Sequence, residues 1–204
     1  MTAIIDLLCA MILGGVILAT ILSANDNAVE NHYVVHGDML VQELLLGTVP
    51  VIESEFRNMG FGTSEDQATV LQADSSSITF LTCQSYGGSI DTVRYSVGDT
   101  TELRATQNQK DRYLHRRVNS SKATNVGVVT YFKLAYRNQV GEVLPTPVPL
   151  DRLSEVYTLE ITMEVQNPYA LYRKHSTPNS GEPNALYSKS FWQETVLTSR
   201  NVRR

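Results

Sequence analysis

The chain has 204 residues, of which 42% are hydrophobic, and its formal net charge is −4 at pH 7. A sequence pI near 5.6 gives no general basic field, so nucleic acid is not an expected partner. The two cysteines, Cys9 and Cys83, lie in an apolar stretch and in the later part of the chain, which excludes a framework of stabilising disulfides. The length leaves room for one globular domain of about 140 residues after a helical N-terminal segment.

The N-terminal segment is almost wholly apolar. Residues 2–23 carry one charged side chain, Asp6, and contain the pair Gly14 and Gly15. A helix of this length spans about 33 Å, which is enough to cross the hydrocarbon core of a bilayer. Residues 1–23 are therefore predicted to be a transmembrane helix.

Asp6 is the unusual residue in this segment, because a carboxylate in hydrocarbon costs several kcal/mol unless it reaches water or finds a cationic partner. One interpretation is that Asp6 lies close enough to the N-terminus to reach the headgroup water. The other is that its carboxylate neutralises the terminal amine of a neighbouring subunit whose first residue is Thr2. The second interpretation would make the anchor an assembly device.

Orientation in the membrane does not follow from charge, since no Lys or Arg precedes Arg57. A cleaved secretory signal is an alternative for residues 1–23. That alternative lacks a basic first region, and Ser23-Ala24-Asn25 is only a weak small-residue cleavage site.

Residues 24–62 continue as an amphipathic helix. After a polar exit from the membrane, apolar residues recur at spacings of three and four, which is typical of one buried helical stripe. Pro50, with Gly47 before it, predicts a kink or break near residues 46–50. Gly60 and Gly62 are expected to end the helix. The stripe consists of Val34, Val41, Leu45, Val49, Ile52, Phe56 and Met59.

Residues 63–204 change from a helical to an alternating pattern and predict a β-domain. The clearest strand is 156–166, in which Tyr157, Leu159, Ile161, Met163 and Val165 alternate with polar residues. Further strands are predicted at 77–83, 91–97, 126–137 and 187–198, the last including Trp192. Intervening turns favour antiparallel hairpins. The fold class is α+β: a long N-terminal helix followed by a mostly antiparallel sheet.

Two loops stand out. Residues 144–150 contain three prolines and should be extended, and residues 167–186 form a polar excursion with three further prolines.

No constellation for catalysis is present, and an enzyme is not expected. His32 and His36 have a helical metal-ligand spacing but no third ligand nearby, so a solvated helix face is the better interpretation. Asp91, Asp99 and Asp111 match no calcium loop. We expect no metal and no cofactor.

A basic cluster occurs late in the chain. Its members are interpreted as solvated strand and terminal charges, with contact to acidic partner subunits as the alternative. They are Arg112, His115, Arg116 and Arg117, with Arg200, Arg203 and Arg204 at the C-terminal end.

The start Thr-Ala-Ile-Ile-Asp-Leu-Leu-Cys-Ala-Met-Ile-Leu-Gly-Gly, residues 2–15, resembles the mature N-terminus of type IV pilins and type II secretion pseudopilins. With Thr2 as the mature first residue, Asp6 stands at position five, where the family usually has Glu. Weaker matches at 91–95, 114–116, 128–137 and 159–165 resemble the globular part of the larger, J-type minor pseudopilins and comparable minor type IV pilins.

The resemblance implies a subunit matured by a prepilin peptidase, with N-terminal methylation. Asp6 would pair with the amine of Thr2 in an adjacent subunit. Leu7, Leu8, Met11, Gly14 and Gly15 would pack against neighbouring helices. Implied partners are other pilin or pseudopilin subunits, the inner-membrane assembly machinery and membrane lipid. The chain would be a single-pass inner-membrane protein with a periplasmic domain, or part of an extracellular filament, with its domain at or near the tip.

A different class of function also fits the sequence. The β-domain could be a free-standing, membrane-anchored binding module that recognises a ligand or an envelope polymer. Asp6 would then be incidental.

Overall fold

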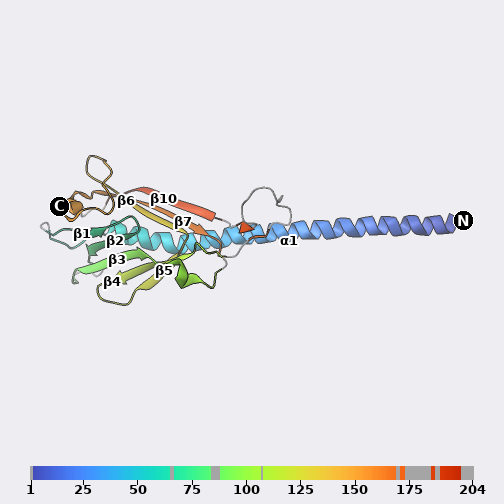
Figure 1. Cartoon of the computed structure of the whole chain (residues 1–204), viewed down its shortest axis with the longest axis horizontal. Coiled ribbons are helices and arrows are strands. Elements are labelled where there is room, and N and C mark those ends of the chain that lie inside the picture. Colours follow the sequence, from blue (N-terminus) through green and yellow to red (C-terminus); the bar gives the residue numbers. More distant parts are fainter. Residues whose placement is uncertain are drawn as a thin grey trace.

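The computed structural model describes residues 2–64, 67–83, 88–106, 108–168, 171–172, 185–186 and 189–198. One long helix, α1, spans Thr2–Arg57 and is followed by a β-domain. Figure 1 shows the N-terminal half of α1 projecting far beyond this domain, whereas its C-terminal half runs alongside the strands. The predicted fold class, a long apolar N-terminal helix followed by antiparallel sheet, is confirmed.

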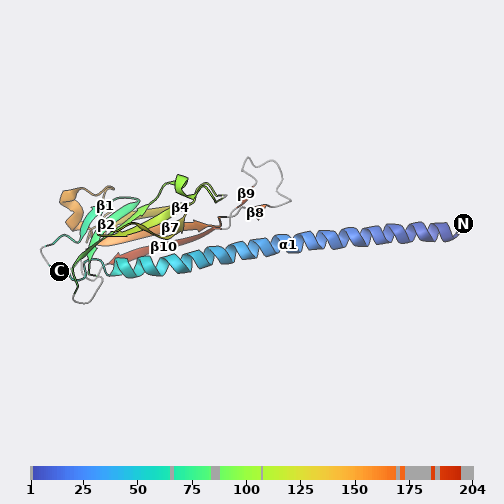
Figure 2. The same ribbon diagram turned by 90° about the horizontal axis from the view of Figure 1, so that it is seen from below.

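The helix is continuous where the sequence predicts a kink or break. Pro50 lies inside α1, so the expectation of a break near residues 46–50 is wrong. Proline removes the donor for the carbonyl of Leu46, but Leu46 and Pro50 lie on the exposed side of the helix, where water can bond that carbonyl. Figure 2 shows α1 curving gently along its length.

After Arg57 the chain reverses at Gly60 and Gly62. Both have positive φ, +76° and +80°, which only glycine adopts without strain. The turn is bound to the domain, since Gly60 N–H donates to the Leu81 carbonyl at 2.7 Å and Cys83 N–H to the Phe61 carbonyl at 2.7 Å.

The strands form two main sheets, antiparallel throughout. A five-stranded sheet has the order β1-β2-β3-β4-β5, and a three-stranded sheet has the order β10-β7-β6. The five strands are β1 (Val70–Ala73), β2 (Ser77–Thr82), β3 (Asp91–Val97), β4 (Arg112–Val118) and β5 (Thr124–Val129). The three are β6 (Tyr131–Arg137), β7 (Thr158–Gln166) and β10 (Lys189–Thr198), and β8 (Leu171–Tyr172) pairs with β9 (Ala185–Leu186). Two short 3-10 helices are η1 (Thr100–Leu103) and η2 (Leu150–Glu155).

The single strand expected at 126–137 is two strands that belong to different sheets. β5 ends at Val129, and β6 begins at Tyr131. Between them the hydroxyl and the N–H of Thr130 both bond the Glu164 carbonyl, at 3.2 and 2.9 Å. The chain thus crosses from one sheet to the other within a run that is uniformly β-forming, and local pattern cannot show such a crossing.

Other strand predictions are confirmed to within a few residues. β7 shows the expected alternation, with Leu159, Ile161, Met163 and Val165 at most 3% exposed. The segment 144–150 is extended up to η2 and is anchored where Val148 N–H donates to the Ala73 carbonyl at 2.8 Å. Most of the expected loop 167–186 and the last six residues lie outside the described residues.

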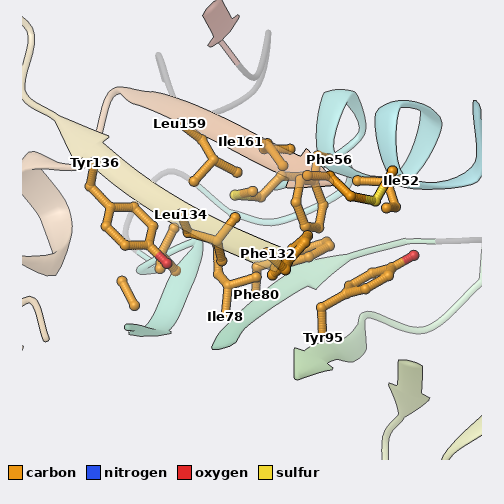
Figure 3. Close-up of a cluster of buried hydrophobic side chains, with 14 of the residues drawn as sticks. Ile52, Phe56, Ile78, Phe80, Tyr95, Phe132, Leu134, Tyr136, Leu159 and Ile161 are labelled. Carbon is orange, nitrogen blue, oxygen red and sulfur yellow. The ribbon is translucent and has the colours of Figure 1, made fainter. Parts of the chain in front are cut away.

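The core lies where α1 meets both sheets (Figure 3). Phe56 of α1 is at its centre, and its ring makes edge-to-face contacts with Phe80 of β2 (5.4 Å between centroids) and Tyr95 of β3 (5.1 Å). The predicted stripe on α1 is confirmed, since Val41, Ile52 and Phe56 are buried and Val34, Leu45 and Val49 partly so. Its last member, Met59, is also buried and lies in the turn just after α1.

Replacing Ile52 with Ala should reduce the free energy of unfolding by about 3 kcal/mol, because Ile52 is fully buried and its loss leaves a cavity. Leu46→Ala is the matched control on the same helix: Leu46 is 75% exposed, and we expect a change below about 0.5 kcal/mol. Chemical denaturation of the detergent-solubilised chain, followed by the fluorescence of Trp192, measures both. Equal effects would contradict the docking of α1 on the domain.

Candidate assembly surface

The N-terminal half of α1 projects from the domain with its surface uncovered. All its residues from Ala3 to Val29 are exposed, and the helix is long and apolar enough to cross a membrane by length and composition. Its large apolar side chains are 54% to 68% exposed up to Leu22. They are Ile4, Ile5, Leu7, Leu8, Met11, Ile12, Leu13, Val16, Ile17, Leu18, Ile21 and Leu22.

This surface, residues 3–22, is here called the apolar rod. Moving one such side chain out of water is favourable by about 1.5–3 kcal/mol, so the twelve together favour coverage by on the order of 20 kcal/mol. Isolated exposed apolar residues are normal on proteins, whereas a continuous surface of this size marks contact with lipid or with other apolar elements.

Asp6 and the residues predicted to pack beside it lie on the apolar rod, and Thr2 is the first residue of α1. Asp6 is exposed in the second turn of α1, one helical turn after Thr2. Leu7, Leu8 and Met11 are exposed beside it.

Gly14 and Gly15 have no atom within 4 Å of the position of an added Cβ. Nothing among the described residues therefore requires glycine there, which leaves close approach of another helix as a prediction.

The C-terminal half of α1 is held against β5 by a close contact. Thr48 is only 3% exposed, and a Cβ on Gly127 would lie 2.3 Å from the Thr48 hydroxyl oxygen. That hydroxyl donates to the Leu44 carbonyl at 2.9 Å, which satisfies it inside the helix. Gly127 is therefore required by packing, a role that its place in a β-forming run did not reveal.

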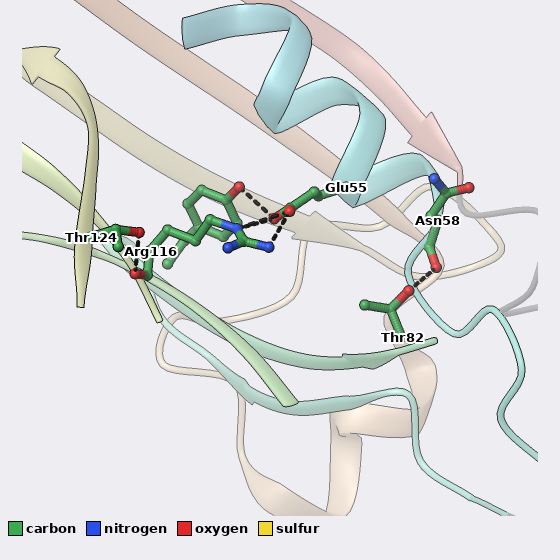
Figure 4. A network of polar contacts seen from close by, with 6 residues as sticks. Glu55, Asn58, Thr82, Arg116 and Thr124 are labelled. Carbon is green, nitrogen blue, oxygen red and sulfur yellow. Dashed lines mark hydrogen bonds and ion pairs between the residues drawn. The ribbon is translucent and has the colours of Figure 1, made fainter. Parts of the chain in front are cut away.

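A charged cluster joins α1 to β3 and β4 (Figure 4). The Nε of Arg116 lies 2.8 Å from both carboxylate oxygens of Glu55, and Arg116 also bonds Glu55 through a second guanidinium nitrogen. Tyr95 donates its hydroxyl to the same carboxylate at 2.6 Å. The Glu55 and Arg116 side chains are only 20% and 21% exposed, so the pair is largely shielded from solvent. Removing one partner of such a pair costs about 3 kcal/mol or more.

This cluster corrects the expectation that Arg116 is a solvated strand charge. Arg116 shares the inward face of β4 with Leu114, which is fully buried. Residues two apart in a strand lie on the same face, so Arg116 shares the face of Leu114. This spacing is the signal in the sequence that could have shown that Arg116 faces the core.

Burial and hydrogen bonding shift the pKa values of three side chains in the domain. Burial and the hydrogen bond to Glu55 raise the pKa of Tyr95, and hydrogen bonds to Glu55 raise the pKa of Arg116. Burial and the charge of Asp74 raise the pKa of Tyr136, whose hydroxyl donates to the Asp74 carbonyl at 2.8 Å. Both tyrosines therefore stay neutral in the folded protein well above their ordinary pKa.

The three aspartates weighed as calcium ligands have separate structural surroundings. Asp91 accepts from the Asn119 amide at 2.7 Å. Asp99 caps η1, and its bond from the Thr101 N–H lowers the pKa of its carboxyl. Asp111 is 1% exposed, and burial raises the pKa of its carboxyl.

His32 and His36 lie on the exposed side of α1 with ring centroids 6.3 Å apart. Across the described ranges, no group of three or more His, Cys, Asp or Glu side chains is placed to hold a metal ion.

Alkaline pH should destabilise the fold through Tyr95 and Tyr136. Their ordinary pKa is 10.0 and their folded pKa is higher, so above about pH 10 the unfolded chain releases protons that the folded chain keeps. The free energy of unfolding is then fully retained below pH 10 and falls by at most about 1.4 kcal/mol per pH unit for each tyrosine. Denaturation between pH 8 and about pH 11.5 measures the slope, and Tyr95→Phe or Tyr136→Phe should reduce it. Tyr131→Phe, at an exposed position, is the control; a slope unchanged in the first two variants would refute the assignment.

No family model matches the chain, and no curated protein matches it either. Among solved structures it is similar to a type IV-like pilin from Thermus thermophilus. The two share 15% sequence identity with a TM-score of 0.48 over 80% of this chain and 97% of that chain. A likeness of this degree transfers no residue's role from one protein to the other.

Proposed function

We propose that the chain is a pilin-type filament subunit, of the minor pilin or pseudopilin kind, that assembles through the apolar rod. One observation carries this proposal: a continuous apolar surface of α1 is exposed over its whole circumference and carries a single carboxylate, Asp6, near its start. Lipid alone could cover the apolar side chains, but it gives the carboxylate no partner. A bundle of neighbouring helices covers the apolar side chains and can also supply a cation.

The cation in this proposal is the α-amine of Thr2 in an adjacent subunit. An amine and a carboxylate of opposite charge attract strongly at short distance in a medium of low dielectric constant, and this attraction offsets part of the cost of removing each charge from water. Pairing would fix the axial offset between neighbouring subunits, while the apolar contacts supply most of the binding energy.

The rest of the molecule fits this task. The domain is bound to α1 through the core around Phe56 and the cluster around Glu55, so it moves with the helix. Subunits would wait as single-pass proteins in the inner membrane with the domain in the periplasm. An assembly machinery would then transfer the apolar rod from lipid to the filament core. No chemistry on a substrate is required.

Asp6→Ala should abolish assembly while the protein remains at its normal level in the membrane. Asp6→Glu should retain it, because the carboxylate is kept on a chain one methylene longer. Assembly is measured as filament yield or secretion in the native host, with the protein quantified by immunoblot. Normal assembly by Asp6→Ala would refute the pairing of Asp6 with the Thr2 amine.

Intact mass and N-terminal sequencing of the protein from native membranes should give a processed start at Thr2 with an added methyl group. The amine that pairs with Asp6 is the mature terminus, so its position fixes the register of the pair. A mature start at Ala24 or later would mean that residues 1–23 are a removed signal, and the assembly proposal would fail.

A further inference from the structure

Charge is divided unequally between α1 and the rest of the chain. Seven acidic residues and no Lys or Arg precede Arg57. All 17 Lys and Arg residues lie at or after Arg57, where they outnumber the acidic residues. The chain as a whole is acidic, yet it consists of a strongly acidic helix and a weakly basic remainder.

Two arginines face each other on the outer side of the five-stranded sheet. Arg94 of β3 and Arg117 of β4 are directly paired in the antiparallel register. Val93 and Tyr95, on either side of Arg94, are fully buried, and Tyr95 contacts α1, so the alternation of the strand places the half-buried Arg94 on the opposite, outer face. Arg117 is exposed, one residue after the inward-facing Arg116.

Like charges directly opposite each other destabilise a sheet. Neither Arg94 nor Arg117 bonds an acidic side chain within the described residues, unlike Arg116, Arg137 and Arg152, which all have one. The turn that follows β4 also carries an exposed cation, Lys122. This surface, called here the arginine face, thus has a repulsion that an acidic partner would relieve.

Helix α1 carries a surplus of negative charge that complements the arginine face. Asp38 and Glu43 of α1 are exposed, and neither forms an ion pair in the described part of the chain. They cannot reach the arginine face of their own molecule, because Tyr95 and Arg116 contact α1 on the inner side of the sheet and Arg94 and Arg117, one position along each strand, lie on its outer side. The two halves of an ionic contact are therefore held apart within one chain.

We infer that the arginine face binds the acidic segment of α1, around Asp38 and Glu43, in a second copy of this chain. The inference rests on the proposed function, which already sets α1 helices side by side. Exposed ion pairs are individually weak, so the contact determines how neighbouring copies are placed more than how strongly they bind. It also requires copies beside one another, which puts the chain along a filament and not singly at a tip.

The test uses two differently tagged full-length copies, co-expressed in the native host, extracted in mild detergent and isolated through one tag. Arg94→Glu with Arg117→Glu in both copies should lower co-isolation about tenfold at about 0.1 M salt, and less at about 1 M salt, where charges are screened. Asp38→Lys with Glu43→Lys should have the same effect. Combining all four reversals should restore co-isolation.

Lys133→Glu is the matched control, because Lys133 is an exposed cation on β6 in the other sheet and should have no effect. Denaturation followed by Trp192 fluorescence verifies that the reversed variants remain folded. Failure of wild-type copies to co-isolate, undiminished co-isolation after arginine reversal, or no rescue by the fourfold reversal would each overturn the inference. Asp6→Ala separates the two proposals: if it abolishes co-isolation while arginine reversal does not, assembly through the apolar rod stands and the ionic contact fails.

Discussion

The structure depends on one constraint: the chain carries an apolar helix whose first half is left uncovered by the described residues. The β-domain buries only the C-terminal half of α1, around Phe56, and the apolar rod projects away from it. Its coverage must come from outside the molecule, from lipid or from other helices. The single carboxylate of Asp6 then favours an environment that contains a matched cation.

A second feature joins this unburied half to the domain. Glu55 lies one residue before Phe56, so the same turn of α1 supplies both the central aromatic ring of the core and the acceptor for Arg116 and Tyr95. The apolar contacts supply most of the energy, and the ionic contact fixes how the helix is rotated about its axis. Rotation matters because it decides which exposed side chains of α1 face away from the domain.

Local pattern was enough to predict the parts of the fold that depend on local chemistry. The apolar segment, the buried stripe through Ile52 and Phe56, and the alternation in β7 all follow from periodicity along a single element. The sequence failed where distant segments decide the outcome. The crossing at Thr130 depends on Glu164, and the inward turn of Arg116 depends on an acid 61 residues away. Likewise β1, only four residues long, was missed because its pairing with β2 stabilises it more than its own sequence does.

The candidate site divides in the same way. The residues of the apolar rod are evident in the sequence, because a continuous apolar segment of this length is recognisable from composition alone. The arginine face is not, since its meaning comes from strand register: Arg94 and Arg117 are 23 positions apart and become neighbours only through the pairing of β3 with β4.

The unbroken course of α1 through Pro50 has a mechanical consequence. A helix rises about 1.5 Å per residue, so drawing 20 residues out of a bilayer would push the domain forward by about 30 Å, with no hinge to absorb the stroke. The one weak point is the hydrogen bond missing at Pro50, and it lies on the exposed side. A helix bends most easily where that bond is absent, with the side that lacks the bond convex. Load along α1 would therefore be expressed as bending at Pro50, and not as a break between the two halves of the helix.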